Sequence, residues 1–455
     1  MNFRADEIAA ATGGRLVQSG PPGPVGTDTR RLQPGVWFLA LVGENFDGHA
    51  FLSHAAAAGC AGVIANRVPE GWTRGFVEVL DTLRALQDLA AHVRSGFDGP
   101  VIGLTGSAGK TTTRALTALA LEGLGEVYQT EGNLNNLVGV PLTLLRAPLG
   151  AAAWVLELGM NRFGEIARLA EISRPTIRLI TNVGPAHLEG VGSLEGVARA
   201  KGELFASAEP DDICCVNADD PLASGIPTPP GVRVIRFGTA PGAEVRLTDA
   251  VVDAEQLVTR FRIEVADEVV LGQIRSPGLH LAMNAAAAVA VAVAARAPLQ
   301  GLGRRLARYE PVGMRNRIEE GPGGLRVLND AYNANPMSMA ASLRTLSALS
   351  GRRIALLGDM LELGEGEHEA HRETLALALS LGLDLVGVAG PRFGRAALEV
   401  PGARVAPDAP SLGALVRDEL RPGDTVLVKG SRGSRMETAL AALSDEAPGA
   451  EERAR

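Results

Sequence analysis

The stretch V-I-G-L-T-G-S-A-G-K-T-T-T, residues 101–113, decides the fold of this chain. Its apolar first part predicts a strand over Val101–Thr105, and a helix is predicted to follow over Lys110–Glu122. Glycines allow the loop between them to curl so that backbone N–H groups point at phosphate oxygens, and the helix N-terminus adds partial positive charge. The stretch therefore predicts a nucleotide-phosphate loop at the end of a buried strand.

Within this loop, Lys110 is expected to neutralise the β- and γ-phosphates, and the Thr111 hydroxyl to bind Mg²⁺. The general phosphate-loop pattern has a glycine six residues before the lysine, where this chain has Leu104, so only the shorter form T-G-S-x-G-K-T-T is met. A glycine turn that caps a helix beside a chance lysine is the alternative, and the strand–loop–helix context argues against it. The predicted phosphate contacts are Gly106, Ser107, Ala108, Gly109, Lys110, Thr111 and Thr112.

Outward from the loop, strands and helices continue to alternate. Such alternation predicts an α/β fold with a doubly wound, mainly parallel central sheet. Residues 244–275 read instead as an antiparallel appendage, and a helix is predicted near Asn284–Ala297. The other elements expected around the loop are strands at Ala153–Leu158, Ile177–Val183 and Asp212–Asn217 and a helix over Gly164–Glu171.

At 455 residues the chain is too long for one hydrophobic core, and about three domains are expected. We predict a small N-terminal α/β domain over residues 1–98, the central domain over residues 99–310, and a Rossmann-like C-terminal α/β domain over residues 311–455. The N-terminal domain is expected to contain strands at Val36–Leu41 and Ala61–Asn66 and helices at Phe51–Gly59 and Thr82–Arg94. The C-terminal domain is expected to contain strands at Leu325–Asp330, Arg353–Leu357, Leu383–Val388 and Asp424–Val428.

The composition narrows the class of protein. Hydrophobic residues make up 46% and charged residues 21%, as in ordinary globular proteins, and the net charge of −8 disfavours a nucleic-acid binder. The longest apolar run, Ala285–Ala295, has about half the length that a bilayer requires, so no membrane insertion is expected. No secretory signal opens the chain, and its three cysteines have neither metal-ligand nor disulfide spacing. We therefore expect a cytoplasmic protein.

Two residues at strand ends form a candidate metal site. Glu157 ends the apolar strand W-V-L-E, and His187 follows the next strand in T-N-V-G-P-A-H. Because the carboxyl ends of parallel strands line the ligand crevice, these side chains suit an Mg²⁺ ion that bridges to phosphates. The alternatives are a surface salt bridge for Glu157 and a hydrogen-bonded loop histidine for His187. Lys201, near the start of a predicted helix, would by itself be read as a solvated lysine.

Motifs along the whole chain are similar to those of the Mur ligase family, and they occur in the family's order. Y-N-A-N-P (residues 332–336) and G-D-M-L-E-L-G (residues 358–364) resemble the branch that adds D-alanyl-D-alanine, whereas branches that add single amino acids usually carry D-Y-A-H-x-P. The other matching segments are D-T-R (28–30), F-L-A-L-V-G-E-N-F-D-G-H (38–49), T-G-S-A-G-K-T-T-T (105–113), E-G-N-L-N-N-L-V-G-V-P (131–141), E-L-G-M (157–160), T-N-V-G-P-A-H (181–187), A-K-G-E-L-F (200–205), N-A-D-D-P (217–221) and P-G-L-H-L-A-M-N-A (277–285).

The resemblance implies a set of site residues. Lys110, Glu157, His187 and Lys201 would be catalytic, with Thr111, Glu157 and His187 as magnesium ligands and Lys201 carbamylated. Asn284 would contact adenine, and Arg315, Asp330 and Asn333 would contact ATP from the third domain. The substrates would meet Asp28, Thr29, Arg30, Asp47, His49, Asn133, Asn135, Asn136 and Asn335. The chain departs from the family pattern at Leu281, where asparagine is usual, at Arg114, where lysine is common, and at Arg317, which competes with Arg315 for one role.

The resemblance implies an ATP- and magnesium-dependent ligase that joins D-Ala-D-Ala to a UDP-muramoyl tripeptide through an acyl phosphate. Nothing in the sequence demands more than a monomer, so a monomer is expected. In this reaction Lys110 and Mg²⁺ would allow the substrate carboxylate to approach the γ-phosphate. Two alternatives stay open. A sibling ligase, such as a folylpolyglutamate synthase, would use another acceptor, and a nucleotide-switch binding protein would form no covalent product.

Overall fold

The computed structural model describes residues 1–43 and 46–443. Glu44 and Asn45, within the 38–49 segment, and residues 444–455 of the predicted third domain lie outside the described residues. The chain forms two compact units. The first contains Met1–Gly103, Gly125–Gly159 and Gly164–Thr176, and the second contains Leu104–Leu124, Met160–Phe163 and the described residues from Ile177 onward. The predicted boundaries at 98/99 and 310/311 stay a prediction.

The N-terminal part of the first unit is a five-stranded sheet of order β1-β7-β6-β3-β2. Its central strands β3 and β6 are buried, as their apolar residues predict, and the amphipathic helix α3 (Thr82–Ser95) confirms the helix predicted there. The exposed edge strand β1, whose two apolar residues are adjacent and do not alternate with polar ones, was not predicted. The other bounds are α1 Ala5–Thr12, β1 Arg15–Gln18, β2 Val25–Gly26, β3 Trp37–Leu39, β4 Val42–Gly43, β5 Phe46–Asp47, α2 Leu52–Ala57, β6 Gly62–Ala65 and β7 Gly75–Glu78.

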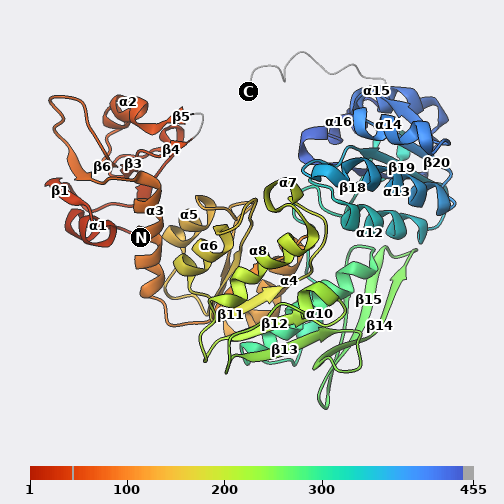
Figure 1. The fold of residues 1–455 in the computed structure, drawn as a ribbon, viewed down its shortest axis with the longest axis horizontal. Coiled ribbons are helices and arrows are strands. Elements are labelled where there is room, and N and C mark those ends of the chain that lie inside the picture. Colours follow the sequence, from red (N-terminus) through yellow and green to blue (C-terminus); the bar gives the residue numbers. More distant parts are fainter. Residues whose placement is uncertain (44–45, 444–455) are drawn as a thin grey trace. The chain divides into compact units, whose positions relative to one another are not determined.

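The central sheet has nine strands in the order β16-β15-β14-β13-β12-β11-β8-β10-β9. Strands β11 to β14 pair in parallel, and β14 to β16 pair antiparallel, so the doubly wound sheet and its antiparallel appendage are both confirmed. Figure 1 shows the appendage as the long green hairpin of β14 and β15. The bounds are β8 Val101–Thr105, β9 Val127–Gln129, β10 Ala153–Glu157, β11 Ile177–Ile180, β12 Ile213–Asn217, β13 Arg233–Gly238, β14 Val245–Asp253, β15 Val258–Val265 and β16 Glu268–Ile274.

The helices of the central region correct two expectations. Helix α10 begins at Leu279, directly after Gly278, and not near Asn284. Lys201 lies in the second half of α8, not near its start, because Ser193 caps the helix by accepting from the N–H of Gly196 at 3.1 Å. The bounds are α4 Lys110–Leu121, α5 Gly139–Arg146, α6 Glu165–Ser173, α7 Leu188–Val191, α8 Leu194–Ala206, α9 Pro221–Ser224, α10 Leu279–Ala294 and α11 Leu302–Leu306.

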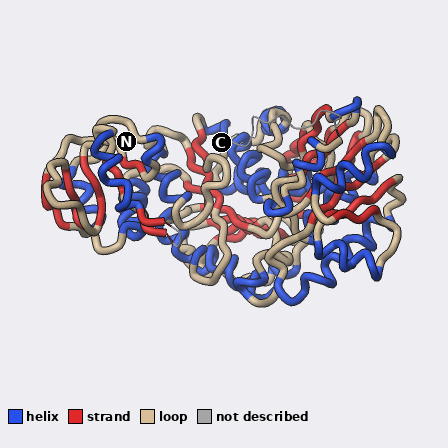
Figure 2. Tube along the Cα trace, turned by 90° about the horizontal axis from the view of Figure 1, so that it is seen from above, coloured by secondary structure: helices blue, strands red, loops and turns tan. Residues whose placement is uncertain are grey.

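The C-terminal part of the second unit is a six-stranded sheet of order β17-β18-β22-β19-β20-β21. All its strand pairs are parallel except β17–β18, as in a Rossmann-like domain, and helices accompany the strands (Figure 2). The bounds are β17 Arg317–Glu320, β18 Arg326–Asp330, α12 Pro336–Ser347, β19 Arg353–Gly358, α13 Glu367–Ser380, β20 Leu385–Ala389, α14 Pro391–Glu399, β21 Arg404–Ala406, α15 Ala409–Val416, β22 Thr425–Lys429 and α16 Glu437–Ala441.

The helices and the cysteines bear on the membrane and redox expectations. Within the described ranges, no helix combines the length and apolarity needed to cross a bilayer. Cys60, Cys214 and Cys215 are free thiols buried in the hydrophobic core.

Candidate nucleotide and ligation site

The phosphate loop joins β8 to α4 in the second unit, as predicted. Gly109 lies at the N-cap of α4 with a φ of 76°, a conformation that L side chains rarely adopt. Gly106 is also required, because a Cβ atom there would lie 1.8 Å from Oγ1 of Thr181. The loop therefore needs both glycines for different reasons: one for its backbone angle and one for close contact with the segment after β11.

Residues after β11 bind the loop backbone at several points. The carboxamide oxygen of Asn182 accepts from the N–H groups of Ser107 and Ala108 at 3.1 and 2.8 Å. The carbonyl of Ala108 accepts from Nδ2 of Asn182 at 3.0 Å and from Oγ1 of Thr181 at 2.9 Å. Ser107 and Gly184 exchange two hydrogen bonds, at 2.8 and 2.9 Å. Sequence reasoning assigned no role to Thr181 or Asn182, although both lie in the T-N-V-G-P-A-H segment.

Lys110 and Thr111 are the first two residues of α4, directly after the loop. Nζ of Lys110 donates to the carbonyl of Gly106 at 2.7 Å, so the ammonium group folds back over the loop. Thr111 is buried at the start of α4. The carboxamide of Asn284, on α10, packs beside Gly109, since a Cβ atom on that glycine would lie 2.8 Å from Oδ1. The structure thus brings Asn284 to the loop, and its predicted contact with adenine stays a prediction.

Lys201 is 1% exposed, which contradicts its reading as a solvated lysine. Burial, together with the charge of Lys110, holds the pKa of Lys201 well below its usual value. A lowered pKa favours the neutral, nucleophilic form of the amine, which is the form that reacts with CO₂. Helix α8 is held at its C-terminal end by Arg178, which donates to the carbonyl of Leu204 at 2.8 Å and pairs with Asp212 at 2.7 Å.

His187 has a carboxylate partner that the sequence did not reveal. Its Nδ1 lies 2.7 Å from Oε2 of Glu362, and the hydrogen bond from His187 lowers the pKa of Glu362. Both residues have positive φ, 56° and 63°, although neither is glycine. Such backbone strain is typical of functional sites. The G-D-M-L-E-L-G segment was the available signal for Glu362, but it carried no assigned role.

The loop that presents Glu362 is firmly held. Asp359 is buried, and its two oxygens accept from N–H groups in the first turn of α14 at 2.9 and 3.1 Å. Nε2 of His371 accepts from the N–H of Met360 at 2.9 Å, and Oγ of Ser431 accepts from that of Leu361 at 2.9 Å. Three successive residues are thereby fixed, and Glu362 follows them.

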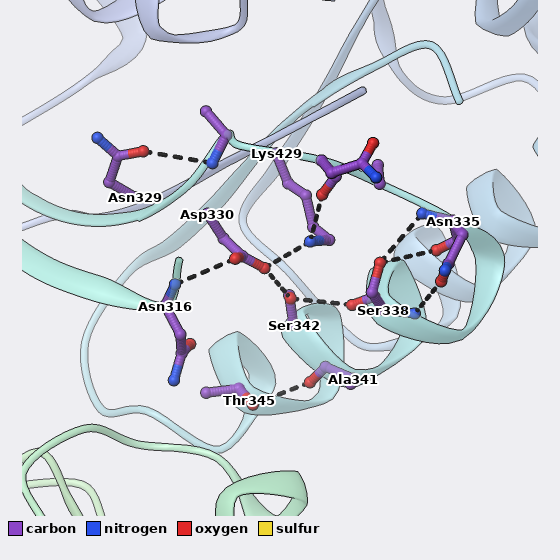
Figure 3. A network of polar contacts seen from close by, with 12 residues as sticks. Asn316, Asn329, Asp330, Asn335, Ser338, Ala341, Ser342, Thr345 and Lys429 are labelled. Carbon is purple, nitrogen blue, oxygen red and sulfur yellow. Dashed lines mark hydrogen bonds and ion pairs between the residues drawn. The ribbon is translucent and has the colours of Figure 1, made fainter. Parts of the chain in front are cut away.

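Asp330 is the centre of a polar network at the end of β18 (Figure 3). Its Oδ2 accepts from Nζ of Lys429 at 2.5 Å and from the hydroxyl of Ser342 at 2.7 Å, and its Oδ1 accepts from the N–H of Asn316 at 3.0 Å. Lys429 also donates to the carbonyl of Asn333 at 3.1 Å. The structure therefore brings two predicted ATP contacts, Asp330 and Asn333, together around a buried lysine that sequence reasoning missed.

The two competing arginines have different surroundings. The guanidinium of Arg315 lies 3.6 Å from the ring centroid of Tyr332, in the Y-N-A-N-P segment. Arg317 begins β17 and pairs with Glu319 at 3.7 Å. Asn335, from the same segment as Tyr332, caps α12 and donates from Nδ2 to the carbonyl of Ser107 at 3.1 Å. Asn335 thus reaches the phosphate loop itself.

In the first unit, Glu157 is buried at the end of β10. Its Oε1 accepts from Nδ2 of Asn135 at 2.9 Å, and its N–H donates to Oγ1 of Thr130 at 3.1 Å. Asn136 points its carboxamide oxygen at the N–H groups of Val138 and Gly139, the latter at 2.8 Å, and so holds the start of α5. Asn133 is exposed and supplies a carbonyl to the N–H of Asn135.

The remaining predicted substrate residues form two small clusters in the first unit. Arg30, next to Thr29, binds Asp28 through Nε and a terminal nitrogen, at 2.9 and 2.8 Å, and lowers the pKa of Asp28 to about 2. Asp47 binds Nδ1 of His49 at 2.5 Å and Arg67 at 2.7 Å. Nε2 of His49 accepts from a backbone N–H at 3.3 Å, so the ring donates through Nδ1. Arg67 was not predicted.

Comparison with known proteins gives the family. Residues 104–292 match the Mur ligase middle domain, and residues 314–432 match the Mur ligase glutamate ligase domain. The UDP-N-acetylmuramoyl-tripeptide–D-alanyl-D-alanine ligase of Escherichia coli is 35% identical over 425 residues, which cover 92% of this chain and 93% of that protein. The chain belongs to the Mur ligase family.

Solved structures of Mur ligases resemble the whole chain as well. A crystal structure of MurF from Acinetobacter baumannii has a TM-score of 0.91 and 31% identity, and covers 97% of this chain and 99% of its own. MurF from Thermotoga maritima in complex with ADP has a TM-score of 0.82 and 28% identity, covering 92% and 97%. The fold prediction of a multidomain α/β protein with a large, mainly parallel central sheet is therefore confirmed.

The magnesium ligands predicted for this Mur ligase stay a prediction. Among the described residues, no group of three or more histidines, cysteines, aspartates and glutamates could hold a metal ion. The predicted ligands comprise one carboxylate, one hydroxyl and one imidazole; the first two are the oxygen donors that Mg²⁺ prefers, and the imidazole is not. Thr111 and His187 belong to the second unit and Glu157 to the first.

Proposed function

We propose that this Mur ligase joins D-alanyl-D-alanine to a UDP-N-acetylmuramoyl tripeptide with cleavage of ATP to ADP and phosphate, a step of peptidoglycan synthesis. The single observation that carries the proposal is the extent of its likeness to a UDP-N-acetylmuramoyl-tripeptide–D-alanyl-D-alanine ligase, which covers 92% of the chain at 35% identity. The phosphate loop, with Lys110 held over it, supports ATP as the energy source.

The reaction begins at the terminal carboxylate of the tripeptide. Its oxygen attacks the γ-phosphorus of ATP, the bond to the β,γ-bridging oxygen breaks, and an acyl phosphate and ADP form. The neutral amine of D-Ala-D-Ala then attacks the acyl carbon, and phosphate leaves from the tetrahedral intermediate as the amine proton is released. Bound Mg²⁺ would supply positive charge that lets two anions meet in the first step.

Each group of residues has a proposed part. Lys110 and the loop amides hold the phosphates, with Thr112 in the first turn of α4, and Glu157, His187 and Thr111 hold magnesium. Asp330, Asn333 and Arg315 contact ATP, and Asn284 contacts adenine. The clusters at Asp28–Arg30 and Asp47–His49 bind the UDP-substrate, whereas Asn133, Asn135, Asn136 and Asn335 line the peptide path.

Lys201 is proposed to carry a carbamate. Its neutral amine would attack CO₂, forming an N–C bond with loss of a proton. The product would be a carbamate anion in place of an amine that can carry positive charge. The burial of Lys201 supports the neutral amine that this reaction needs, because an uncompensated ammonium is costly there, and the carbamate would need nearby positive charge to offset its own burial. If it is correct, Lys201→Ala should lose ligation and regain part of it when short carboxylates are added.

We further propose a cytoplasmic monomer of three domains, with boundaries near residues 98 and 310, whose closure assembles the site. A cytoplasmic location suits the use of ATP and a UDP-linked substrate. Monomeric state would be read from the mass in solution, with and without ADP.

The deciding experiment supplies ATP, Mg²⁺, UDP-muramoyl tripeptide and D-Ala-D-Ala, and follows the products by mass spectrometry. A UDP-muramoyl pentapeptide with stoichiometric phosphate is expected, and Lys110→Ala should form none. Phosphate release with a single amino acid or a folate in place of the dipeptide would indicate a sibling ligase. ATP hydrolysis with no covalent product would leave the nucleotide-switch alternative.

A further inference from the structure

The phosphate loop of this chain lacks the first glycine of the general pattern. Leu104 occupies that position and is fully buried within β8, so it cannot contribute to the curl of the loop. Gly106 and Gly109 allow the shape of residues 106–109, and contacts from outside the loop hold it. The hydrogen bonds from the segment after β11, and above all from Asn182, are the contacts that the structure offers.

Asn182 binds the loop through both ends of its carboxamide. The oxygen accepts two successive loop N–H groups, and the nitrogen donates to the carbonyl of Ala108, which also accepts from Thr181. A planar trans peptide carries its C=O and N–H groups in opposite directions. Because the carbonyl of Ala108 is held toward Asn182 and Thr181, the N–H of Gly109 points away from them. That direction suits a phosphate oxygen at the N-terminus of α4.

We propose that Asn182 is a positioning residue for the ATP phosphates, an inference that rests on the proposed use of ATP. By fixing the Ala108–Gly109 peptide, Asn182 presets the N–H of Gly109 toward the ATP phosphates before the nucleotide arrives. The competing possibility is that Asn182 occupies the place of a phosphate oxygen and must leave when ATP binds. The two possibilities predict opposite effects on affinity, since removal of a support weakens binding and removal of a competitor strengthens it.

The test uses Asn182→Ala and Asn182→Asp in the full chain. The aspartate is isosteric and keeps an acceptor for the loop N–H groups, but it loses the donor to Ala108 and adds negative charge beside the phosphates. Calorimetric titration with ADP and with a non-hydrolysable ATP analogue should show roughly tenfold weaker binding for the alanine variant and a larger loss for the aspartate variant. In ligation assays KM for ATP should rise by a similar factor, with a smaller change in kcat.

Asn217→Ala is the matched control. Asn217 is a buried carboxamide of the same region whose hydrogen bonds go to the carbonyl of Thr181 at 2.8 Å and to the N–H of Asp219 at 3.0 Å, not to the loop. It should lower the melting temperature and leave nucleotide affinity near that of the wild type. Unchanged or tighter nucleotide binding in both Asn182 variants, with intact thermal transitions, would overturn the proposal. Because binding is measured without the other substrates, a wild-type enzyme that forms no pentapeptide would count against the proposed function and not against the positioning by Asn182.

Discussion

The imidazole of His187 and the carboxylate of Glu362 lie 2.7 Å apart although 175 residues separate them in the chain. Both occupy left-handed backbone conformations, and the segment before Glu362 is anchored by Asp359. When the Nδ1–H of a histidine donates a hydrogen bond to a carboxylate, Nε2 is left with the lone pair that binds a metal ion, and the carboxylate fixes the orientation of the ring. The pairing thus gives the G-D-M-L-E-L-G segment a physical role beside the proposed magnesium site.

Glu362→Gln should weaken the use of magnesium. The amide oxygen is a weaker acceptor for the Nδ1–H of His187 than the carboxylate is, so the ring is oriented less firmly and we expect KM for Mg²⁺ to rise by roughly tenfold or more. Titration of Mn²⁺ followed by electron paramagnetic resonance should show the same loss without any turnover. Glu365→Gln, which changes an exposed carboxylate directly after that segment, is the control and should behave as the wild type. Identical metal titrations for the two variants would contradict the role of Glu362.

Changing Asn135 should disturb Glu157. Asn135→Ala removes the donor at 2.9 Å from Glu157, whereas Asn135→Asp places a second carboxylate against a buried one. Like charges raise the pKa of one member of such a pair. We therefore expect both variants to lose ligation, the aspartate variant more severely and with partial recovery at higher pH. A pH profile of kcat/KM measures the difference, and equal, pH-independent losses would contradict it.

His280 should make stability depend on pH. Burial, opposed by Asp330 and assisted by Lys429, lowers the pKa of His280 from 6.5 to about 4. The unfolded chain therefore binds the proton more readily between these values, and stability falls as pH decreases through that window, with a slope of up to about 1.4 kcal/mol per pH unit. Urea unfolding at several pH values gives the free energy of unfolding as a function of pH. His280→Gln should reduce the slope of this curve between pH 4 and 6.5, and His54→Gln, at an exposed position, should leave the slope unchanged. Parallel profiles for wild type and His280→Gln would refute the assignment.

Asp359→Ala should destabilise the C-terminal region more than loss of an ordinary helix cap. Asp359 is buried and binds two N–H groups of α14, whereas Asp408 is an exposed cap that binds the N–H of Ser411 at 2.8 Å. An exposed cap contributes about 1 kcal/mol, and leaving buried donors unsatisfied costs roughly 1–3 kcal/mol. Urea unfolding of Asp359→Ala and Asp408→Ala gives the comparison. A smaller loss for Asp359→Ala would be unexpected.

The sequence by itself determined the local elements of the site. Strand β8, the loop glycines and α4 follow from apolar runs and turn chemistry within a few residues, and the motifs pointed to Asp330 and Asn333. These features depend on neighbours in the chain, so a linear pattern contains them.

Only the tertiary structure decided which distant groups meet. Lys429 reaches Asp330 across 99 residues, and Glu362 reaches His187 across 175. It also showed that Lys201 is buried and that Asn182 holds the phosphate loop. The physical reason is that such contacts arise from strand order, helix packing and backbone strain at particular turns. These depend on the whole fold, and no local pattern of residues encodes them.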